Sequence, residues 1–498
     1  MNVNPITRLD YPDPDVIRVE DTYYMVSTTM HFMPGCEILQ SFDLVHWEHV
    51  TYVYETLDHT DAQQLKSGQN IYGQGMWAAS LRYHEGRFYI CFVANDTRKT
   101  YLYTSEKIDG PWKKQLIEGF YHDGSLLFDE DGRNYIVYGN DEIWITELNE
   151  DLTAPKKDGL HRLLVSDHKN PELGYEGSHI QKINGYYYIF LVHSLRDRWM
   201  RTEACFYSDS LEGEFTGGDV LCDDRGYCGQ GVAQGGIVDT PDGKWYAMLF
   251  QDSGAVGRIP ILLPVTWKDH FPFFGQNGHV PEEIEVHSTR PGYIYQPLVG
   301  SDDFCNGLLP RWQFNHDPDP RYYYLDALQG TYTITTREVC TELTQAVNTL
   351  TQRMSYPSCA AEVTVDASAL KEGDVAGLCA LQSCYAAVGI TKHHGKYEVL
   401  MLDKKEDGIL DMTERTVVES HQMDFRLEAD FCNMKDEARC YYRVNKGDWL
   451  PIGTVHKLYF KLDHFTGCRF GLFCYAAEET GGSACFRDFK YYDVDEIL

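Results

Sequence analysis

Asp123-Gly124-Ser125-Leu126-Leu127-Phe128 leads into the turn Glu130-Asp131-Gly132, and the turn leads into a strand centred on Tyr135. Apolar runs on either side of an acidic, glycine-containing turn are typical of a β-hairpin. The same order of features occurs five times between residue 1 and about residue 295. This recurrence predicts five similar β units.

A tyrosine in the strand after each turn aligns the five units. The tyrosines are Tyr24, Tyr89, Tyr135, Tyr188 and Tyr246, spaced by 65, 46, 53 and 58 residues. A further strand follows in each unit, at residues 37–40, 101–104, 142–146, 204–207 and 261–264. Units of about four strands at this period indicate a β-propeller. The alternatives are a solenoid, whose repeats are usually shorter and more regular, and an all-β region with coincidental hairpins.

The length of 498 residues is enough for two domains. We expect a five-bladed β-propeller at residues 1–298 and a β-sandwich at residues 299–498, with a linker-like passage around the boundary. The second assignment rests on alternating strands such as residues 361–365, 397–401 and 440–444. The predicted fold class is therefore all-β.

The balance of charge disfavours two classes of partner. The chain has 44 Lys and Arg against 75 Asp and Glu, a formal net charge of −31 and a pI near 4.9. Nucleic acids and anionic membrane surfaces attract Lys and Arg, so we expect neither as a partner. No apolar run approaches the roughly 20 residues of a membrane helix.

Cysteine usage and the N-terminal residues bear on location. Residues 1–8 lack the apolar core of a secretory signal, and the 15 cysteines include no C-x-x-C pair. We therefore expect a cytoplasmic protein with reduced thiols. Cys222 and Cys228 are expected to be loop thiols, and His393 and His394 to lie on an exposed turn. Their spacing picks out no metal site.

Counting back about a dozen residues from each tyrosine gives one notable residue per unit. These residues are Asp13, Trp77, Asp123, Glu176 and Gln234. Equivalent positions of a radial repeat converge on its axis, so we expect the three carboxyl groups to meet. Hydrolysis of a glycosidic bond uses two carboxyl groups that flank it, and crowding should raise the pKa of at least one. The pattern predicts a sugar-cleaving pocket.

Four side chains are candidates for binding the sugar, and two of them, Trp77 and Gln234, belong to the five residues named above. Trp77 offers an indole face to the apolar side of a sugar ring. Gln234 could donate a hydrogen bond to a hydroxyl group or a central water, and Arg258 could clamp hydroxyl groups. Phe32 is a candidate pocket wall. A purely structural role is the alternative for each of the four.

Several motifs resemble those of glycoside hydrolase family 43. They are Tyr11-Pro12-Asp13-Pro14-Asp15, Phe42-Asp43-Leu44-Val45-His46-Trp47, Met76-Trp77-Ala78, Asp123-Gly124-Ser125-Leu126, Glu176-Gly177-Ser178-His179 and Gly257-Arg258. The resemblance covers the whole chain, because many members carry a C-terminal β-sandwich of the concanavalin-like, jelly-roll type. It implies an inverting exo-enzyme on a five-bladed propeller.

The resemblance also implies roles. Asp13 would be the general base, Glu176 the general acid, and Asp123 would tune the pKa of the acid and orient it. The family often has His at the position of Gln234, near a central calcium or water, and Pro at the position of Ala79. We expect no required cofactor. The resemblance allows a structural calcium at the propeller centre and, through the sandwich, a homo-oligomer.

We expect release of terminal α-L-arabinofuranosyl residues from arabinoxylan-type oligosaccharides, with inversion. An exo-β-1,4-xylosidase, or an enzyme with both activities, is the alternative, because the same machinery serves both sugars. Two more distant alternatives are a carbohydrate-binding propeller without turnover and a retaining fructosidase. The latter carries an Arg-Asp-Pro motif that this chain lacks. A cytoplasmic exo-enzyme would act on imported oligosaccharides.

Overall fold

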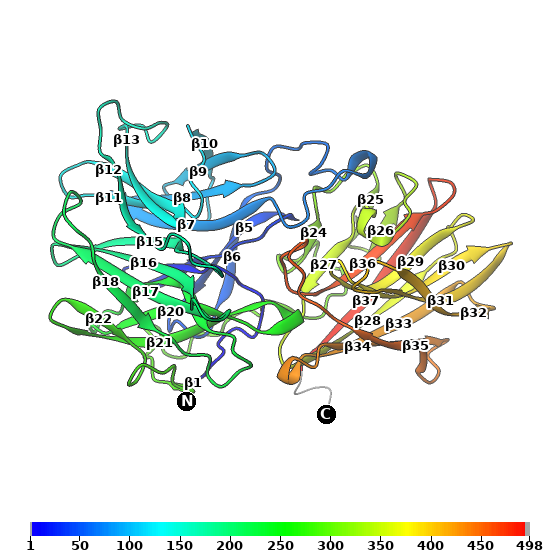
Figure 1. The fold of residues 1–498 in the computed structure, drawn as a ribbon. Coiled ribbons are helices and arrows are strands. Elements are labelled where there is room, and N and C mark those ends of the chain that lie inside the picture. The colour runs from blue at the N-terminus through cyan, green and yellow to red at the C-terminus, as the bar shows by residue number, and fades with distance from the viewer. Residues whose placement is uncertain (1, 494–498) are drawn as a thin grey trace.

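The computed structural model describes residues 2–493, and these residues form two lobes built almost wholly of strands (Figure 1). The N-terminal lobe, blue to green, lies beside the C-terminal lobe, yellow to red. Four 3-10 segments interrupt the strands: η1 (Lys66–Gly68), η2 (Gly254–Val256), η3 (Leu343–Gln345) and η4 (Cys432–Met434). Residues 1 and 494–498 of the predicted domains lie outside the described residues.

The N-terminal lobe contains five four-stranded antiparallel sheets, which are the blades. Blade 1 contains β2 (Asp15–Val19), β3 (Thr22–Val26), β5 (Gly35–Ser41) and β6 (Glu48–Tyr54). Blade 2 contains β7 (Met76–His84), β8 (Arg87–Ala94), β9 (Lys99–Ser105) and β10 (Lys113–Ile117). Blade 3 contains β11 (Ser125–Phe128), β12 (Asn134–Asn140), β13 (Glu142–Leu148) and β14 (His161–Ser166). Blade 4 contains β15 (Glu176–Ile183), β16 (Tyr186–Ser194), β17 (Arg201–Ser208) and β18 (Thr216–Leu221). Blade 5 contains β19 (Val232–Asp239), β20 (Trp245–Asp252), β21 (Arg258–Lys268) and β22 (Phe271–Phe274).

The predicted propeller is confirmed. Each of the five tyrosines lies in the second strand of its blade, and each predicted further strand is the third. Five separate apolar clusters fill the spaces between successive blades. One of them packs Val238, Tyr246 and Met248 of blade 5 against Val16 and Met25 of blade 1. Side-chain packing therefore closes the ring, and β1 (Asn2–Val3) pairs with β23 (Glu283–Ile284) at the same junction.

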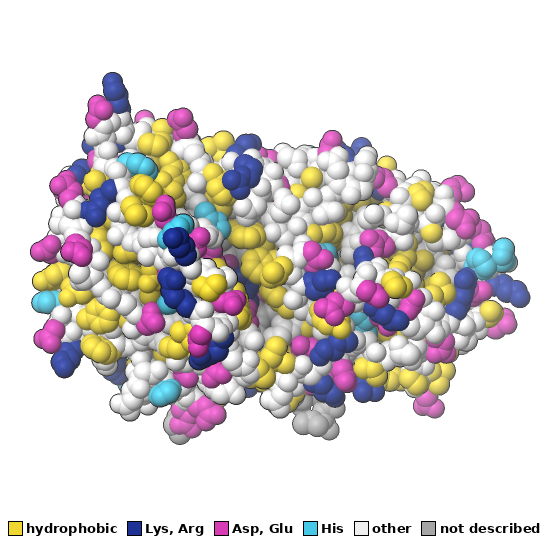
Figure 2. Space-filling view, in the orientation of Figure 1, with side chains coloured by type: hydrophobic (Ala, Val, Ile, Leu, Met, Phe, Trp, Pro, Cys, Tyr) yellow, Lys and Arg dark blue, Asp and Glu magenta, His cyan; other side chains and the backbone are white. Residues whose placement is uncertain are grey.

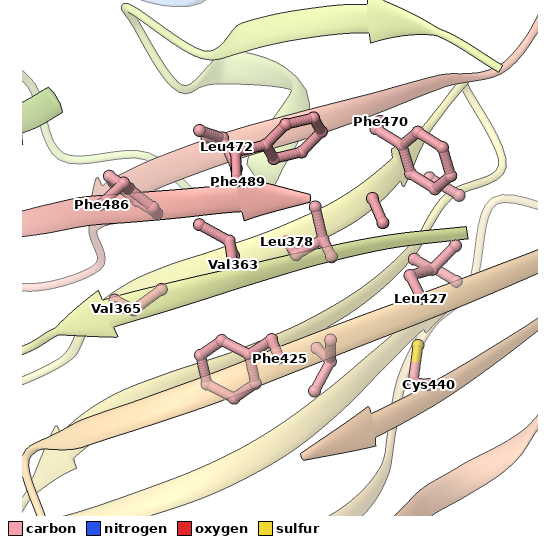
Figure 3. Packing of buried hydrophobic residues seen from close by; sticks show 14 of the residues in the cluster. Val363, Val365, Leu378, Phe425, Leu427, Cys440, Phe470, Leu472, Phe486 and Phe489 are labelled. Carbon is pink, nitrogen blue, oxygen red and sulfur yellow. The ribbon is translucent and has the colours of Figure 1, made fainter. Parts of the chain in front are cut away.

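The C-terminal lobe is the predicted β-sandwich. One sheet has the order β32 (Leu410–Val418), β31 (Lys396–Lys404), β30 (Ala386–His393), β29 (Asp374–Leu381), β36 (Arg469–Ala476), β27 (Leu350–Arg353), β24 (Gln313–Asn315) and β4 (Phe32–Met33). The other has the order β25 (Tyr323–Asp326), β26 (Thr331–Thr335), β37 (Ser483–Asp493), β28 (Ser358–Asp366), β33 (Gln422–Asp430), β34 (Glu437–Val444) and β35 (Leu450–Lys457). Figure 3 shows how the inward residues of the two sheets meet, with Leu378 and Leu472 from one and Val363 and Phe425 from the other.

A strand from the N-terminal lobe completes a sheet of the sandwich. Strand β4 pairs with β24, with Phe32 opposite Asn315 and Met33 opposite Phe314. The two lobes therefore share backbone hydrogen bonds as well as side-chain contacts. The boundary at residues 298 and 299 stays a prediction, since β4 belongs to the sequence of one lobe and to a sheet of the other.

The distribution of charged side chains on the surface and the state of the cysteines can be compared with what the composition predicts. On the face in Figure 2, acidic and basic side chains are interspersed, without a continuous basic patch. Each of the 15 cysteines is free. Among residues 2–493, no helix has the length and the apolar character needed to cross a bilayer.

Candidate active site

A left-handed backbone residue stands at the entrance to the innermost strand of every blade. These residues, with their φ angles, are Asp13 (53°), Ala78 (32°), Asp123 (46°), Gly177 (66°) and Gln234 (64°). Strand pairing shows that they are equivalent, because each lies four positions before the partner of the blade's tyrosine. The partners are Ile17, Arg82, Leu127, Gln181 and Val238.

The prediction that Trp77 and Glu176 occupy the positions equivalent to Asp13, Asp123 and Gln234 is therefore wrong by one residue in blades 2 and 4. Trp77 and Glu176 each lie one residue before the equivalent positions, Ala78 and Gly177. The cause is the hairpin turn. Blades 2 and 4 turn through two residues, Glu85-Gly86 and Asn184-Gly185, whereas blade 3 turns through residues 129–133. A count of twelve back from the tyrosine therefore stops one residue early in blades 2 and 4. Blade 1 also turns through two residues, and there Asp13 lies eleven residues before Tyr24.

Asp13 is held by two donors. Thr28 Oγ1 donates to Asp13 Oδ2 at 2.5 Å, and Arg258 Nη1 donates to Asp13 Oδ1 at 3.1 Å. The Thr28 hydroxyl in turn accepts from the backbone N–H of Ala78 at 2.8 Å, which ties blade 1 to blade 2. Both carboxylate oxygens are thus fixed in direction, as a positioned base requires.

Asp123 and Glu176 meet around a third side chain, His122. Nε2 of His122 lies 3.6 Å from Oδ2 of Asp123 and 3.5 Å from Oε2 of Glu176. The backbone N–H of Gly177 donates to Asp123 Oδ2 at 3.1 Å, and Asn140 Nδ2 donates to Glu176 Oε2 at 2.7 Å. The structure therefore brings the carboxyl groups of blades 3 and 4 to one place.

The charges of this group are coupled. Burial, with added repulsion from Glu176 and Asp13, raises the pKa of Asp123 to about 6, although His122 opposes the rise. The negative charge of Asp123, with further contributions from Glu176 and Asp13, raises the pKa of His122 to about 9. Glu176 and Asp13 therefore act on Asp123 through space, although each comes from a different blade.

The three carboxyl groups differ in access. The side chains of Asp13 and Asp123 are 8% and 6% exposed, whereas that of Glu176 is 18% exposed. The most accessible of the three is thus the glutamate.

His122 is a site residue that the sequence argument missed. It precedes Asp123 as Trp77 precedes Ala78 and as Glu176 precedes Gly177, so it belongs to the same ring of positions. Alignment on the strand partners, instead of a fixed count, would have found it.

Gln234 lies beside Glu176 through a close contact with Gly177. A Cβ atom at Gly177 would come within 2.8 Å of Gln234 Cγ and 3.0 Å of its Nε2, and the φ angle of Gly177 is +66°. Glycine is therefore required there on both counts. The backbone N–H of Gln234 donates to Oε2 of the fully buried Glu203 at 2.7 Å.

An aromatic side chain from the sandwich joins Trp77 and Arg258. The ring of Phe465 lies 5.3 Å from that of Trp77, and the Arg258 guanidinium lies 4.4 Å from the Phe465 ring. Nε1 of Trp77 and Nε of Arg258 are sheltered and have no hydrogen-bond partner among the described residues. Phe465 was not identifiable from the sequence, because Trp77 and Arg258 lie more than 200 residues away along the chain.

Phe32 lies at the junction of the two lobes. It is 2% exposed, and the Arg469 guanidinium lies 3.4 Å from the centre of its ring. Its backbone belongs to β4, at the junction of the lobes. Its predicted role as a pocket wall stays a prediction.

Deeper in the propeller, an ion pair between the fully buried Asp15 and the partly buried Arg82 links several blades. Oδ2 of Asp15 accepts from Arg82 Nη1 at 2.8 Å and from the Leu81 N–H at 2.7 Å, while Oδ1 lies 3.1 Å from His179 Nδ1. Calcium prefers six to eight oxygen ligands, carboxylates among them. Since Arg82 already supplies the positive charge and both Asp15 oxygens are engaged, these residues do not fit a calcium site.

Carboxyl groups brought together by separate blades, with a tryptophan and an arginine beside them, define the class of protein as a glycosidase. The family described as glycosyl hydrolases family 43 matches residues 3–272, and the β-xylosidase C-terminal concanavalin A-like domain matches residues 301–492. The chain belongs to glycosyl hydrolases family 43.

Relatives span more than one named activity. The chain is 27% identical to a β-xylosidase of Formosa agariphila, over 99% of this chain and 89% of that protein. It is 24% identical to a non-reducing end α-L-arabinofuranosidase of Bacteroides ovatus, over 82% of this chain and 79% of that protein. A solved structure of a bifunctional GH43-CE protein of Bacteroides eggerthii is 42% identical, with a TM-score of 0.92 over 99% of this chain. The present chain spans 64% of that one.

Proposed function

We propose that the protein is an inverting exo-glycosidase that releases terminal α-L-arabinofuranosyl residues from arabinoxylan-type oligosaccharides. The convergence of Asp13, Asp123 and Glu176, whose charges act together on His122, carries the proposal. An inverting enzyme needs one carboxyl group as acid and one as base on opposite faces of the sugar.

Each carboxyl group receives a distinct role in this proposal. Asp13, fixed by Thr28 and Arg258, activates the attacking water as general base. Glu176, the most accessible of the three, protonates the leaving oxygen as general acid. Asp123, whose pKa is raised to about 6, orients the acid through the Gly177 N–H and tunes its pKa. Trp77 offers its indole face to the apolar side of the sugar ring, and Arg258 is the donor for sugar hydroxyl groups.

The competing specificity is β-xylosidase, the name that the Formosa agariphila relative carries. We favour the arabinoside because Gln234-Gly235-Gly236 and Trp77-Ala78-Ala79 depart from the pattern of β-xylosidase-like members. Paired assays with nitrophenyl α-L-arabinofuranoside and nitrophenyl β-D-xylopyranoside test this. We expect higher kcat/KM on the arabinoside and free arabinose from arabinoxylo-oligosaccharides. A clear preference for the xyloside would overturn the specificity while leaving the glycosidase assignment intact.

The roles predict a difference between two variants. Glu176→Ala should slow substrates with poor leaving groups much more than activated aryl glycosides, because an activated leaving group needs little proton assistance. Asp13→Ala should lower activity on both by several orders of magnitude, since the attacking water loses its base. Near-normal turnover in Asp13→Ala would contradict the assignment. Proton NMR of the first-formed anomer checks inversion, and early appearance of the retained anomer would exclude it.

A further inference from the structure

We propose that His122, Asp123 and Glu176 form a binding site for a divalent cation of the Zn²⁺ type, and that the bound cation inhibits hydrolysis. One ligand atom from each residue lies within 4.8 Å of the other two. The His122 Nε2 atom is 3.6 Å from Asp123 Oδ2 and 3.5 Å from Glu176 Oε2. Tetrahedral Zn²⁺ with bonds of about 2.0–2.1 Å holds its ligand atoms about 3.3–3.4 Å apart. The two distances from His122 exceed this value by only a few tenths of an ångström, and the oxygens of Asp123 and Glu176 lie within 4.8 Å of each other.

The histidine atom at the centre of this group faces both carboxylate oxygens. Nε2 of His122 is shielded from solvent and makes no hydrogen bond to any described residue. Nε2 of His122 is ion-paired with both carboxylate oxygens, but distances of 3.5 and 3.6 Å are longer than a normal hydrogen bond. A cation at the centre of the group would replace the ring proton and bring all three atoms within bonding distance. Asp123 and Glu176 each accept one hydrogen bond at the oxygen concerned, from Gly177 and Asn140, which fixes the direction of that oxygen.

The donor set selects the kind of cation. Imidazole nitrogen and carboxylate oxygen are both ligand types that Zn²⁺ accepts, and three protein ligands leave a fourth position for water. Two negative carboxylates also balance a 2+ charge. Mg²⁺ and Ca²⁺ prefer all-oxygen sets of six or more ligands, so they should bind much more weakly. The side chains of His122 and Glu176 are 21% and 18% exposed, so the site is open to solvent.

The inhibitory part rests on the proposed function. A cation bound to Glu176 Oε2 takes the oxygen that would deliver the proton to the leaving group. Hydrolysis should therefore stop when the site is filled. Binding itself does not depend on any catalytic role.

The test is cation binding to the full chain after treatment with a chelator. We expect one site per chain by calorimetry with Zn²⁺, and with Co²⁺ an intense visible absorption typical of tetrahedral coordination. His122→Phe should abolish the absorption and weaken binding at least about tenfold. A second variant, Glu176→Gln, should weaken it comparably, and circular dichroism checks that each variant is folded. Inhibition should follow the same dissociation constant as binding.

The exposed pair His393 and His394, whose rings lie 3.9 Å apart, provides the matched control. The double variant His393→Gln, His394→Gln should bind Co²⁺ as the unmodified protein does. The proposal is overturned if tetrahedral absorption is absent, if folded His122→Phe binds normally, or if the control variant loses binding. If Co²⁺ binds as expected but neither arabinoside nor xyloside is cleaved, the proposed function fails and the cation site stands. Cleavage that continues with the site filled would overturn the inhibitory part alone.

Discussion

At the scale of the residue, one buried carboxyl group holds the backbone of a candidate site residue in place. Glu203 in β17 is fully buried, and burial raises its pKa well above 4.5. Its Oε2 accepts from the Gln234 N–H, while Oε1 has no partner among the described residues. It thereby fixes the backbone of Gln234, whose φ of 64° is itself unusual for a residue other than glycine. A protonated Glu203 accepts this hydrogen bond without placing a charge in the core.

Glu203→Gln should become more stable relative to the unmodified protein as pH rises. The folded-state pKa of Glu203 is raised, so its contribution to stability is complete below about pH 4.5 and is lost as pH rises toward the folded pKa. The loss is about 1.4 kcal/mol per pH unit at most, because the unfolded chain ionises while the folded chain keeps its proton. Glutamine does not titrate. Melting temperatures of both proteins between pH 5 and 9 check this.

The exposed Glu150 supplies the control. Glu150→Gln should give a melting temperature that differs from that of the unmodified protein by the same small amount at every pH. If the melting temperatures of Glu203→Gln and the unmodified protein differed by the same amount at every pH, Glu203 would be ionised in the folded protein.

At the scale of the element, the segment between β35 and β36 connects the sandwich to the active site. The His464 ring stacks on Tyr72 at 3.8 Å, and the Gly467 N–H donates to Asp10 Oδ2 at 2.8 Å. Between these anchors, Phe465 lies against Arg258 and Trp77. The segment thus forms one side of the site, although it belongs to the other lobe.

Phe465→Ala should raise KM and lower kcat/KM by about fivefold or more, because an aromatic contact is worth about 1 kcal/mol beyond its buried area. The Arg258 side chain would also lose the ring against which it packs. Steady-state kinetics on the preferred glycoside provide the measurement. Leu462 lies in the same segment and is 75% exposed, so Leu462→Ala should leave both constants unchanged. Equal KM and kcat/KM for the two variants would contradict a role for Phe465 in binding the substrate.

At the scale of the whole molecule, a buried ion pair joins the lobes. Arg353 of the sandwich donates from Nη1 to Glu37 Oε2 of blade 1 at 2.9 Å, with side chains 4% and 3% exposed. Arg353 also donates from Nε to the Asp10 carbonyl oxygen at 2.9 Å and packs on the Tyr11 ring. Despite the opposing effect of burial, Arg353 and His49 lower the pKa of Glu37 to about 2.

Arg353→Met should destabilise the protein by about 3–5 kcal/mol at neutral pH, because it leaves Glu37 buried without its main partner. The folded pKa of Glu37 is lowered, so its favourable contribution is present above about pH 4.5 and is lost as pH falls toward about 2. The difference in the free energy of unfolding between Arg353→Met and the unmodified protein should therefore become smaller below about pH 4.5. Urea unfolding at pH 7 and pH 3 measures it.

Arg439 is the matched surface arginine, with a side chain 51% exposed and 3.5 Å from Glu437. Arg439→Met should change the free energy of unfolding by less than about 1 kcal/mol. A similar loss of unfolding free energy in both variants would show that the buried pair contributes no more to stability than the surface pair.

The sequence by itself determined the five blades and the sandwich, because strand alternation and hairpin turns are local patterns of a few residues. It also identified Asp13, Asp123 and Glu176 by their motifs and their spacing from a strand that each blade repeats. Only the tertiary structure decided that Trp77 and Glu176 lie one position before their expected equivalents, since turn length changes the register of the hairpin. The tertiary structure also brought in His122 beside Glu176, Phe465 beside Trp77 and Arg353 beside Glu37. These contacts join residues that are 54 to more than 300 positions apart, and their partners follow from how whole blades and lobes pack, which no local pattern encodes.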